Sequence, residues 1–232
     1  MVCCALTASS VQNGCRRRVR GPRSATISWL VEERHMTADR SLRLTRGATV
    51  WLTGLSGAGK STVAGAVATL VSGDGADTEV EVLDGDEIRQ TISSDLGFSR
   101  ADRDKQGRRV GFIAELLSRH RVLTLVPVIA PYAETRQAVR ERHAERGSAF
   151  FEVYVATPLQ ECARRDPKGL YARAAAGEIK GLTGVDDVYE HPESPDLEVD
   201  TSSVSPEIAA DRILTMLREH GVLEYAETSV SF

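Results

Sequence analysis

The sequence is poor in cysteine and contains no long apolar segment. Of its four cysteines, Cys3, Cys4 and Cys15 lie close to the N-terminus, and only Cys162 lies in the rest of the chain. This distribution matches neither a disulfide framework nor a zinc-binding pattern, so we expect a protein of the reducing cytoplasm. No apolar run is long enough to span a bilayer, which predicts that the chain does not cross a membrane.

An excess of positive charge is also absent. The 232 residues carry 29 Lys and Arg against 33 Asp and Glu, a formal net charge of −4. This balance argues against a protein that mainly binds nucleic acid, although it leaves room for a local basic pocket that binds a small anion. The chain shows no internal repeat, and its length suits one α/β domain with a full core.

The first 40 residues differ from the remainder. They are rich in Arg and Ser and lack sustained hydrophobic periodicity, which predicts a disordered extension over 1–40, or residues upstream of a translation start at Met36. A transit peptide is the alternative, because no acidic residue precedes Glu32. We place the domain at residues 41–222 and a C-terminal tail at residues 223–232.

Strand and helix patterns alternate along the domain, which implies a mostly parallel sheet covered by helices on both faces. The predicted strands are Thr49–Thr53, Val80–Leu83, Arg121–Ile129, Phe150–Val155 and Asp196–Val199. The predicted helices are Gly59–Val71, Ala101–Arg119, Glu134–Arg146, Pro158–Arg165 and Pro206–His220. The polar segment Lys168–Thr183, rich in Gly and Ala, interrupts the alternation and is a candidate lid over a site.

The segment Gly54–Ser61 reads GLSGAGKS and matches the phosphate-binding pattern G-x-x-x-x-G-K-[ST] in full. It follows a predicted strand and opens a predicted helix, a context that disfavours the alternative of a chance Gly-rich turn. Glycines let backbone N–H groups converge on phosphate oxygens, and the helix N-terminus adds positive partial charge. Lys60 is expected to reach the β- and γ-phosphates of ATP, and the Ser61 hydroxyl to ligate Mg²⁺. The predicted ATP-binding residues are Gly54, Leu55, Ser56, Gly57, Ala58, Gly59, Lys60, Ser61 and Thr62.

The predicted fold is therefore α/β, a P-loop NTPase-type three-layer sandwich with a mostly parallel sheet and a lid segment. A P-loop alone leaves open a GTPase switch, a mechanical ATPase and a small-molecule kinase. The sequence has no guanine-reading NKxD run and no strand that ends in a DExx-type acidic pair, and the chain is too short for a motor. These absences favour a small-molecule kinase over the other two classes.

Two carboxylates, Asp84 and Asp86, follow the second predicted strand. Ligands bind at this edge of an open α/β sheet, so the pair is placed to coordinate metal-bound water and to accept a hydroxyl proton, with Asp86 as the candidate base. The alternative is that Asp86 only caps the helix that begins with EIRQ.

Basic residues gather further along the chain, and a solvated helix face is the usual explanation for such a run. Arg89 and Arg103 follow turn-like breaks, where a guanidinium can grip an anion with two hydrogen bonds. Phe98 is either a core residue or a stacking surface for an aromatic ligand, and the pattern alone favours the core.

Several segments together resemble adenylylsulfate kinase (APS kinase), which phosphorylates the 3′-hydroxyl of adenosine 5′-phosphosulfate (APS) to give PAPS in sulfate assimilation. These segments are GLSGAGKS, LDGDEIR, LGFSRADRD, APY at Ala130–Tyr132, RDPKGLY at Arg165–Tyr171, and GEIKGLTGVDDVYEHPESPDLEVDT at Gly177–Thr201. The resemblance covers residues 40 to 220. RDPKGLY with GEIKG is more specific than the P-loop, because other P-loop kinases lack it.

The resemblance implies roles for individual residues. Asp86 would lie next to the acceptor hydroxyl, Arg89 and Arg103 would bind the phosphosulfate end, and Phe98 would stack on the adenine. The predicted catalytic residues are Asp86, Lys60 and Asp84. The full set of implied substrate contacts is Asp86, Arg89, Phe98, Arg103, Gln106, Ile129, Ala130, Lys168, Lys180 and Leu182. The resemblance also implies ATP and Mg²⁺, a homodimer and a functional link to ATP sulfurylase.

The chain departs from the family pattern on the acceptor and lid side. Gln106 stands where the family usually has Asn, Ala130 where it usually has Ser, Leu182 where it usually has a stacking Phe, and Ala175 where it usually has Arg. Ala130 cannot carry the phosphoserine described in some members. Losing one ring and one guanidinium would weaken acceptor binding by ~1 kcal/mol each.

Three hypotheses follow. The first is an active APS kinase that transfers phosphate in line from MgATP. The second is a paralogous kinase that phosphorylates another small hydroxyl compound, which the departures motivate. The third is a non-catalytic ATP-binding regulatory protein, which the presence of Lys60 and Asp86 disfavours.

Overall fold

A computed structural model describes residues 42–73 and 78–226, so the predicted extension over 1–40 lies outside the described residues. Five parallel strands form the central sheet in the order β3-β4-β2-β5-β6. These strands are β2 (Ala48–Thr53), β3 (Val80–Val82), β4 (Leu123–Pro127), β5 (Ala149–Val155) and β6 (Leu197–Val199). The predicted parallel sheet is confirmed, and each predicted strand is present with its ends shifted by no more than a few residues.

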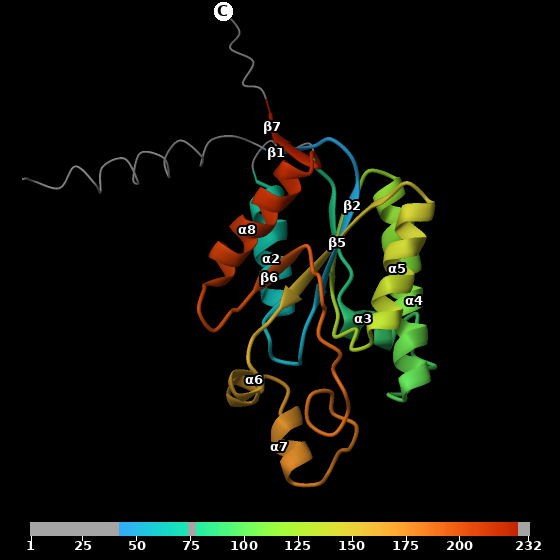
Figure 1. The fold of residues 1–232 in the computed structure, drawn as a ribbon, viewed down its shortest axis with the longest axis vertical. Helices are drawn as coiled ribbons and strands as arrows, with labels where there is room; N and C mark the ends of the chain where they lie inside the picture. Colours follow the sequence, from blue (N-terminus) through green and yellow to red (C-terminus); the bar gives the residue numbers. More distant parts are fainter. Residues whose placement is uncertain (1–41, 74–77, 227–232) are drawn as a thin grey trace, which may run out of the picture. The chain divides into compact units, whose positions relative to one another are not determined.

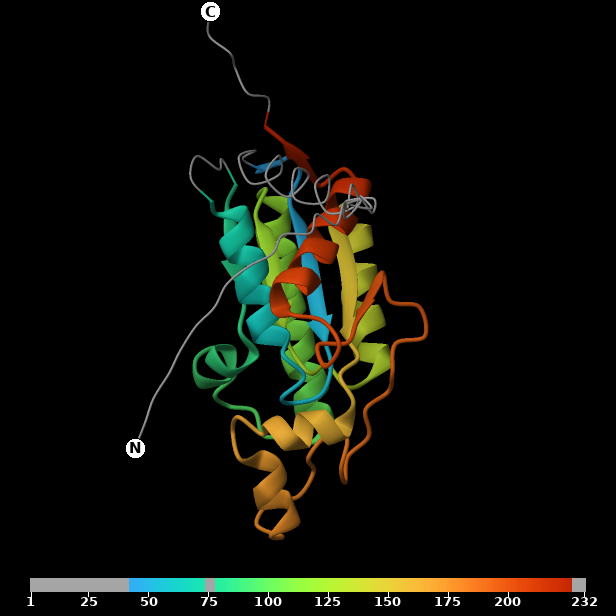
Figure 2. The same ribbon diagram turned by 90° about the vertical axis from the view of Figure 1, so that its left-hand side faces the viewer.

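Helices cover both faces of the sheet, as the sequence predicts (Figures 1 and 2). On one face α2 (Lys60–Val71) packs beside α8 (Pro206–Glu219), and on the other α4 (Arg100–Arg119) packs beside α5 (Ala133–Glu145). Three shorter helices lie near the carboxyl ends of the strands: α3 (Gly85–Gln90), α6 (Leu159–Arg165) and α7 (Leu170–Ala175).

The central strand β2 shows why this sequence forms a three-layer structure. All six of its residues are buried. Val50 and Leu52 pack in the core that includes α2 and α8, whereas Trp51 packs in the core that includes α4. Because alternate side chains point to opposite faces, a strand that is buried on both faces must be covered by helices on both sides.

A second, two-stranded sheet corrects the predicted C-terminal boundary. The sequence predicts a tail at residues 223–232, but Leu223–Tyr225 form β7, which pairs antiparallel with β1 (Leu42–Leu44). Leu223 is 2% exposed and lies opposite Leu44, so burial of apolar side chains holds this segment against the domain.

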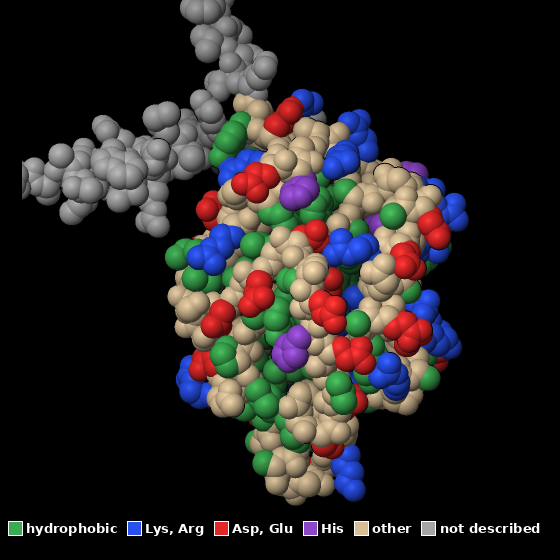
Figure 3. All heavy atoms as spheres, in the orientation of Figure 1, with side chains coloured by type: hydrophobic (Ala, Val, Ile, Leu, Met, Phe, Trp, Pro, Cys, Tyr) green, Lys and Arg blue, Asp and Glu red, His purple; other side chains and the backbone are tan. Residues whose placement is uncertain are grey.

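No helix within residues 42–73 and 78–226 is long and apolar enough to cross a membrane. On the face drawn in Figure 3, acidic and basic side chains are interspersed and do not gather into one basic patch.

Candidate active site

A cavity of about 610 Å³ opens where β2, β3 and β4 end. Its lining combines P-loop residues with residues that follow β3 and β4, and with residues from α4 and the α6–α7 region. An open parallel sheet binds ligands at this edge, because the loops that leave the carboxyl ends of neighbouring strands meet there. The predicted site residues in the lining are Ser56, Gly57, Gly59, Lys60, Ser61, Thr62, Asp84, Asp86, Arg89, Phe98, Arg103, Gln106, Ile129, Ala130 and Lys168.

The P-loop joins β2 to α2 and depends on glycine. Gly57 has φ of 76°, and a Cβ atom there would lie 2.9 Å from the Cys162 carbonyl oxygen. Gly59 is the N-cap of α2 in the left-handed conformation and forms no side-chain cap hydrogen bond. The first N–H groups of α2 therefore have no capping side chain as acceptor, which is the arrangement that favours phosphate at a helix N-terminus.

We expect Gly57→Ala to weaken ATP binding by about tenfold or more, because a Cβ atom both disfavours the left-handed conformation by roughly 1–2 kcal/mol and meets the Cys162 carbonyl. Titration of a nucleotide monitored by fluorescence would measure this effect. Gly65→Ala is the matched control, since Gly65 lies in α2 with nothing within 4 Å of the added Cβ. The control should keep nucleotide affinity and raise stability by roughly 0.5–1 kcal/mol. Equal affinity of both variants for ATP would contradict the prediction.

Lys60 lies inside the site. Its Nζ donates hydrogen bonds to the carbonyl oxygens of Gly54 and Leu55 at 2.9 and 2.7 Å, and the residue is only 9% exposed. Burial lowers the pKa of the Lys60 ammonium from 10.5 to about 8. The ammonium is therefore a desolvated cation at the P-loop, where a phosphate oxygen would compete with the two carbonyls.

Asp84 links the P-loop to the second strand. It is the N-cap of α3, because its Oδ1 accepts the Asp86 N–H at 2.8 Å, and its Oδ2 accepts the Ser61 hydroxyl at 3.0 Å. The alternative that Asp86 caps this helix is therefore wrong, since Asp84 has that role. The Ser61 hydroxyl and the Asp84 carboxylate are adjacent oxygen donors of the kind that Mg²⁺ binds together with water and phosphate.

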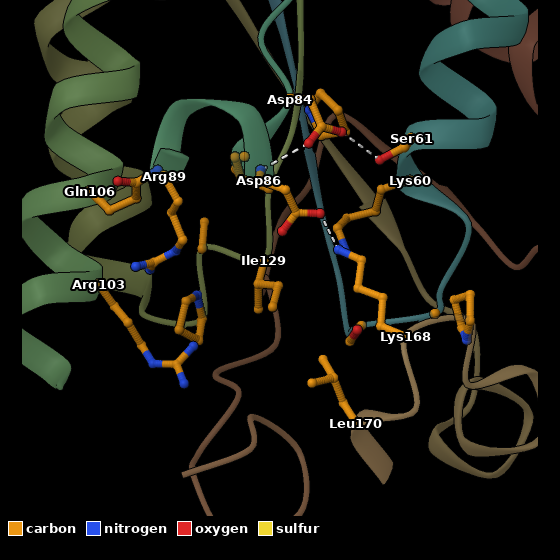
Figure 4. A pocket seen from close by; sticks show the side chains of 18 of the residues that line it. Lys60, Ser61, Asp84, Asp86, Arg89, Arg103, Gln106, Ile129, Lys168 and Leu170 are labelled. Carbon is orange, nitrogen blue, oxygen red and sulfur yellow. Dashed lines mark hydrogen bonds and ion pairs between the residues drawn. The ribbon is translucent and has the colours of Figure 1, made fainter. Parts of the chain in front are cut away.

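The Asp86 carboxylate points toward the cavity (Figure 4) and forms an ion pair with Lys168, which belongs to the predicted lid. The Asp86 side chain remains 59% exposed. A carboxylate that neither caps a helix nor is buried can accept a hydroxyl proton from a ligand in the cavity.

Three side chains form a cationic and aromatic group on the far side of the cavity. The Arg89 guanidinium lies 4.6 Å from the ring centroid of Phe98, and Arg103 donates from Nε to the Phe98 carbonyl at 2.9 Å. Burial, and then the neighbouring Arg103, lowers the pKa of Arg89. Phe98 is 67% exposed, so the interpretation of Phe98 as a core residue is wrong and its ring is accessible for stacking.

Comparison with known proteins identifies the family of this chain. Residues 46–200 match the family model described as adenylylsulphate kinase. The chain belongs to the adenylylsulfate kinase family. It is 50% identical over 179 residues to the adenylyl-sulfate kinase of Synechococcus sp. (strain JA-3-3Ab), covering 77% of this chain and 98% of the relative.

Solved structures agree with this assignment. The APS kinase CysC of Mycobacterium tuberculosis, solved in complex with AMPPNP and APS, superposes with a TM-score of 0.72 at 48% identity. The match covers 75% of this chain and 98% of that chain. A hexameric APS kinase from Thiobacillus denitrificans superposes with a TM-score of 0.59 at 36% identity, covering 85% of this chain and 33% of that chain.

Two residues that the family resemblance places at the acceptor do not line the cavity. Lys180 is exposed, and Leu182 is 7% exposed and packs in the large hydrophobic core. The Asp186 carboxylate accepts the backbone N–H groups of Gly181 and Leu182 at 2.7 and 2.6 Å, which holds this turn and the Leu182 side chain in place. Their contacts with an acceptor remain a prediction.

The structure also reveals support for the P-loop that the sequence analysis missed. The Thr157 and Thr201 hydroxyls donate to the Ala58 carbonyl at 3.0 and 2.9 Å, and the Tyr171 hydroxyl donates to the Ser56 carbonyl at 2.9 Å. A Thr or Tyr far from the P-loop in sequence carries no pattern that reveals such a bond. The family resemblance gave a signal for two of the three, because its segments Arg165–Tyr171 and Gly177–Thr201 contain Tyr171 and Thr201.

Proposed function

We propose that this chain transfers the γ-phosphoryl group of ATP to the 3′-hydroxyl of adenosine 5′-phosphosulfate. The observation that carries the proposal is one continuous cavity with the P-loop and Lys60 on one side and Asp86, Arg89, Phe98 and Arg103 on the other. A triphosphate on the first side and a nucleotide with an anionic tail on the second would meet near Asp86.

In this mechanism Lys60 and the N–H groups at the start of α2 hold the phosphates of ATP, and Ser61 and Asp84 would hold Mg²⁺ through oxygen. Mg²⁺ supplies charge neutralisation on the phosphate oxygens. Asp86 orients the 3′-hydroxyl and accepts its proton as the new oxygen–phosphorus bond forms and the bond to the ADP oxygen breaks. Because little covalent chemistry falls to the protein, positioning and charge supply most of the acceleration.

The acceptor would bind by charge and stacking. Arg89 and Arg103 match the phosphosulfate anion, and the exposed Phe98 ring matches the adenine. Lys168 belongs to the segment 168–183, which we propose as a lid that shields the reacting groups from water. We further propose a homodimer in the cytoplasm and a functional link to ATP sulfurylase. In support of that link, the chain is 49% identical over 172 residues to the bifunctional enzyme CysN/CysC of Mycobacterium tuberculosis.

The direct test is a coupled assay of ADP release with MgATP, in the presence and absence of APS. ADP release that depends on APS, with PAPS as the product, would support the proposal. ADP release with other small hydroxyl compounds only would favour a paralogous kinase. Nucleotide binding without transfer to any acceptor would favour a regulatory protein.

The buried side chain of Gln106 allows a more specific prediction about acceptor binding. The residue is 7% exposed and lines the cavity, and neither its amide oxygen nor its amide nitrogen has a partner within the described part of the chain. An unsatisfied buried amide costs roughly 1–3 kcal/mol, which a ligand that bonds it would recover.

We therefore expect Gln106→Leu to raise the KM for APS by about tenfold and to raise the free energy of unfolding by ~1 kcal/mol. Steady-state kinetics and urea unfolding would measure the two effects. The KM for ATP serves as the internal control, because Lys60 and the other P-loop side chains are unchanged. An unaltered KM for APS would show that Gln106 does not contact the acceptor.

A further inference from the structure

One wall of the cavity has a strained backbone. After β4 ends at Pro127, residues 128–132 lead into α5, and Ile129 and Ala130 line the cavity. Ala130 has φ of 41°, in the left-handed region that a residue with a Cβ atom adopts only when its surroundings impose it. Contacts with other parts of the chain must therefore hold residues 128–132 in this conformation. We call residues 128–132 the acceptor wall.

Arg136 supplies that support from the first turns of α5. Its Nη1 donates to the Ala130 carbonyl at 2.8 Å, and its Nη2 donates to the Glu190 carbonyl at 2.7 Å. Its Nε pairs with the Glu152 carboxylate of β5 at 2.6 Å, and the Arg136 side chain is 4% exposed. A single planar guanidinium thus joins the acceptor wall, the segment that follows the predicted lid, and the central sheet.

Residues 189–190 also form hydrogen bonds with the acceptor wall that do not involve Arg136. The Glu190 N–H donates to the Pro131 carbonyl at 2.8 Å. The Tyr189 hydroxyl lies 3.0 Å from the Thr53 hydroxyl, which donates to the Ile129 carbonyl at 2.6 Å. The wall and residues 189–190 therefore form one hydrogen-bonded unit, and the Arg136 guanidinium donates to both of its parts.

The ATP side of the cavity is held by different residues. Thr157, Thr201 and Tyr171 bond the P-loop carbonyls, and none of them contacts Arg136 by a hydrogen bond in the described part of the chain. Arg136 itself does not line the cavity. A change at Arg136 should therefore act on the acceptor half and leave the nucleotide half intact.

We propose that Arg136 is a positioning residue for the acceptor. It holds Ala130 in its left-handed conformation and ties the acceptor wall to Glu190, in the segment that follows the predicted lid, so it sets acceptor affinity without touching either substrate. This inference rests on the proposed function, because the acceptor is taken to bind against this wall.

The test begins with Arg136→Lys. Lysine keeps a positive charge beside Glu152, but an ammonium group cannot span the two carbonyls and the carboxylate together. We expect the KM for APS to rise by roughly tenfold, the scale of one lost hydrogen bond to a charged group, with the KM for ATP within about twofold of wild type.

Arg140→Lys is the matched control. Arg140 lies one turn further along α5 and pairs with the same Glu152 at 3.5 Å and with Asp196 at 2.8 Å, and it donates to no carbonyl of the wall. A merely structural role would lower the Tm of both variants and leave the KM for APS alone. Equal changes of that KM in Arg136→Lys and Arg140→Lys would overturn the proposal.

A rescue experiment probes the strain at Ala130. Glycine adopts a φ of 41° without a Cβ penalty, so Ala130→Gly should lower the KM for APS more in the Arg136→Lys background than in the wild-type background. Equal effects in the two backgrounds would show that Arg136 does not hold this conformation.

Hydrogen exchange separates this inference from the proposed function. Arg136→Lys should speed exchange of the Ala133 and Glu190 amides, which donate to the Glu190 carboxylate at 2.7 Å and to the Pro131 carbonyl at 2.8 Å, by about tenfold, and Arg140→Lys should not. If the wild type fails to phosphorylate APS, the proposed function fails while the exchange result still tests the wall. Unchanged exchange in Arg136→Lys would overturn the inference.

Should that variant not fold, Arg136→Met with Glu152→Met removes both buried charges together and carries the same expectations.

Discussion

Asp86→Asn is expected to lower kcat for APS phosphorylation by roughly 10²–10⁴-fold, the usual contribution of a positioned proton acceptor. Asparagine preserves the size of the side chain but cannot take the hydroxyl proton. Because Asp84 rather than Asp86 caps α3, the substitution leaves the cap hydrogen bond at 2.8 Å unchanged. The loss should therefore appear in kcat and not in the stability of the helix, as the coupled ADP assay and a thermal melt would show together.

Glu87→Gln is the matched control for Asp86→Asn. Glu87 is the next residue of α3, is exposed and does not line the cavity. Removal of the Glu87 charge should leave kcat within about twofold of the wild-type value. This result would exclude a general effect on kcat of negative charge near the P-loop. If Asp86→Asn keeps kcat within tenfold of wild type, another group must accept the proton.

Lys60→Met is expected to change activity and stability in opposite directions. Loss of the cation that would neutralise the transferring phosphoryl group should lower kcat by roughly 10²–10³-fold. The nucleotide-free variant should nevertheless be more stable at pH 7, because the wild type buries a charged ammonium whose pKa falls from 10.5 to about 8. That shift corresponds to on the order of 3 kcal/mol of destabilisation below pH 8.

The sign of the pH dependence follows from proton binding. Between pH 8 and 10.5 the unfolded chain still binds the Lys60 proton and the folded chain has released it, so the stability of the wild type rises with pH. Lys60→Met lacks this rise, and its advantage in unfolding free energy should shrink through the same window. Other groups that titrate between pH 8 and 10.5 contribute equally to the unfolding free energy of both proteins, so their contributions cancel in the difference.

Denaturant unfolding of both proteins at pH 7, 9 and 10.5 would measure the effect. Lys105→Met is the control, because Lys105 is exposed on α4 and should show no such difference. A constant difference between Lys60→Met and wild type across this range would contradict the lowered pKa of Lys60.

The sequence alone was sufficient for most of the fold. The strand at Thr49–Thr53 was recognised as a run of β-branched and aromatic residues, and helices such as Gly59–Val71 and Ala101–Arg119 from apolar residues at helical spacing, since these patterns reflect local geometry. The strands Leu42–Leu44 and Leu223–Tyr225 were missed because their pairing joins the two ends of the domain, which lie far apart in the sequence.

The phosphate site was equally readable, since its glycines, Lys60 and Ser61 form one continuous segment whose chemistry depends on local backbone conformation. The acceptor side was only partly readable. Sequence pattern favoured Phe98 as a core residue and left the cap role of Asp86 open. The structure leaves Phe98 67% exposed and gives the cap to Asp84.

Only the tertiary structure placed Lys180 and Leu182 away from the cavity, and only it brought Arg136 to the acceptor wall. Burial and hydrogen bonding between distant segments decide these positions. Arg136 shows the reason most clearly, because its partners on residues 130, 152 and 190 become neighbours only after the sheet and its crossovers have formed.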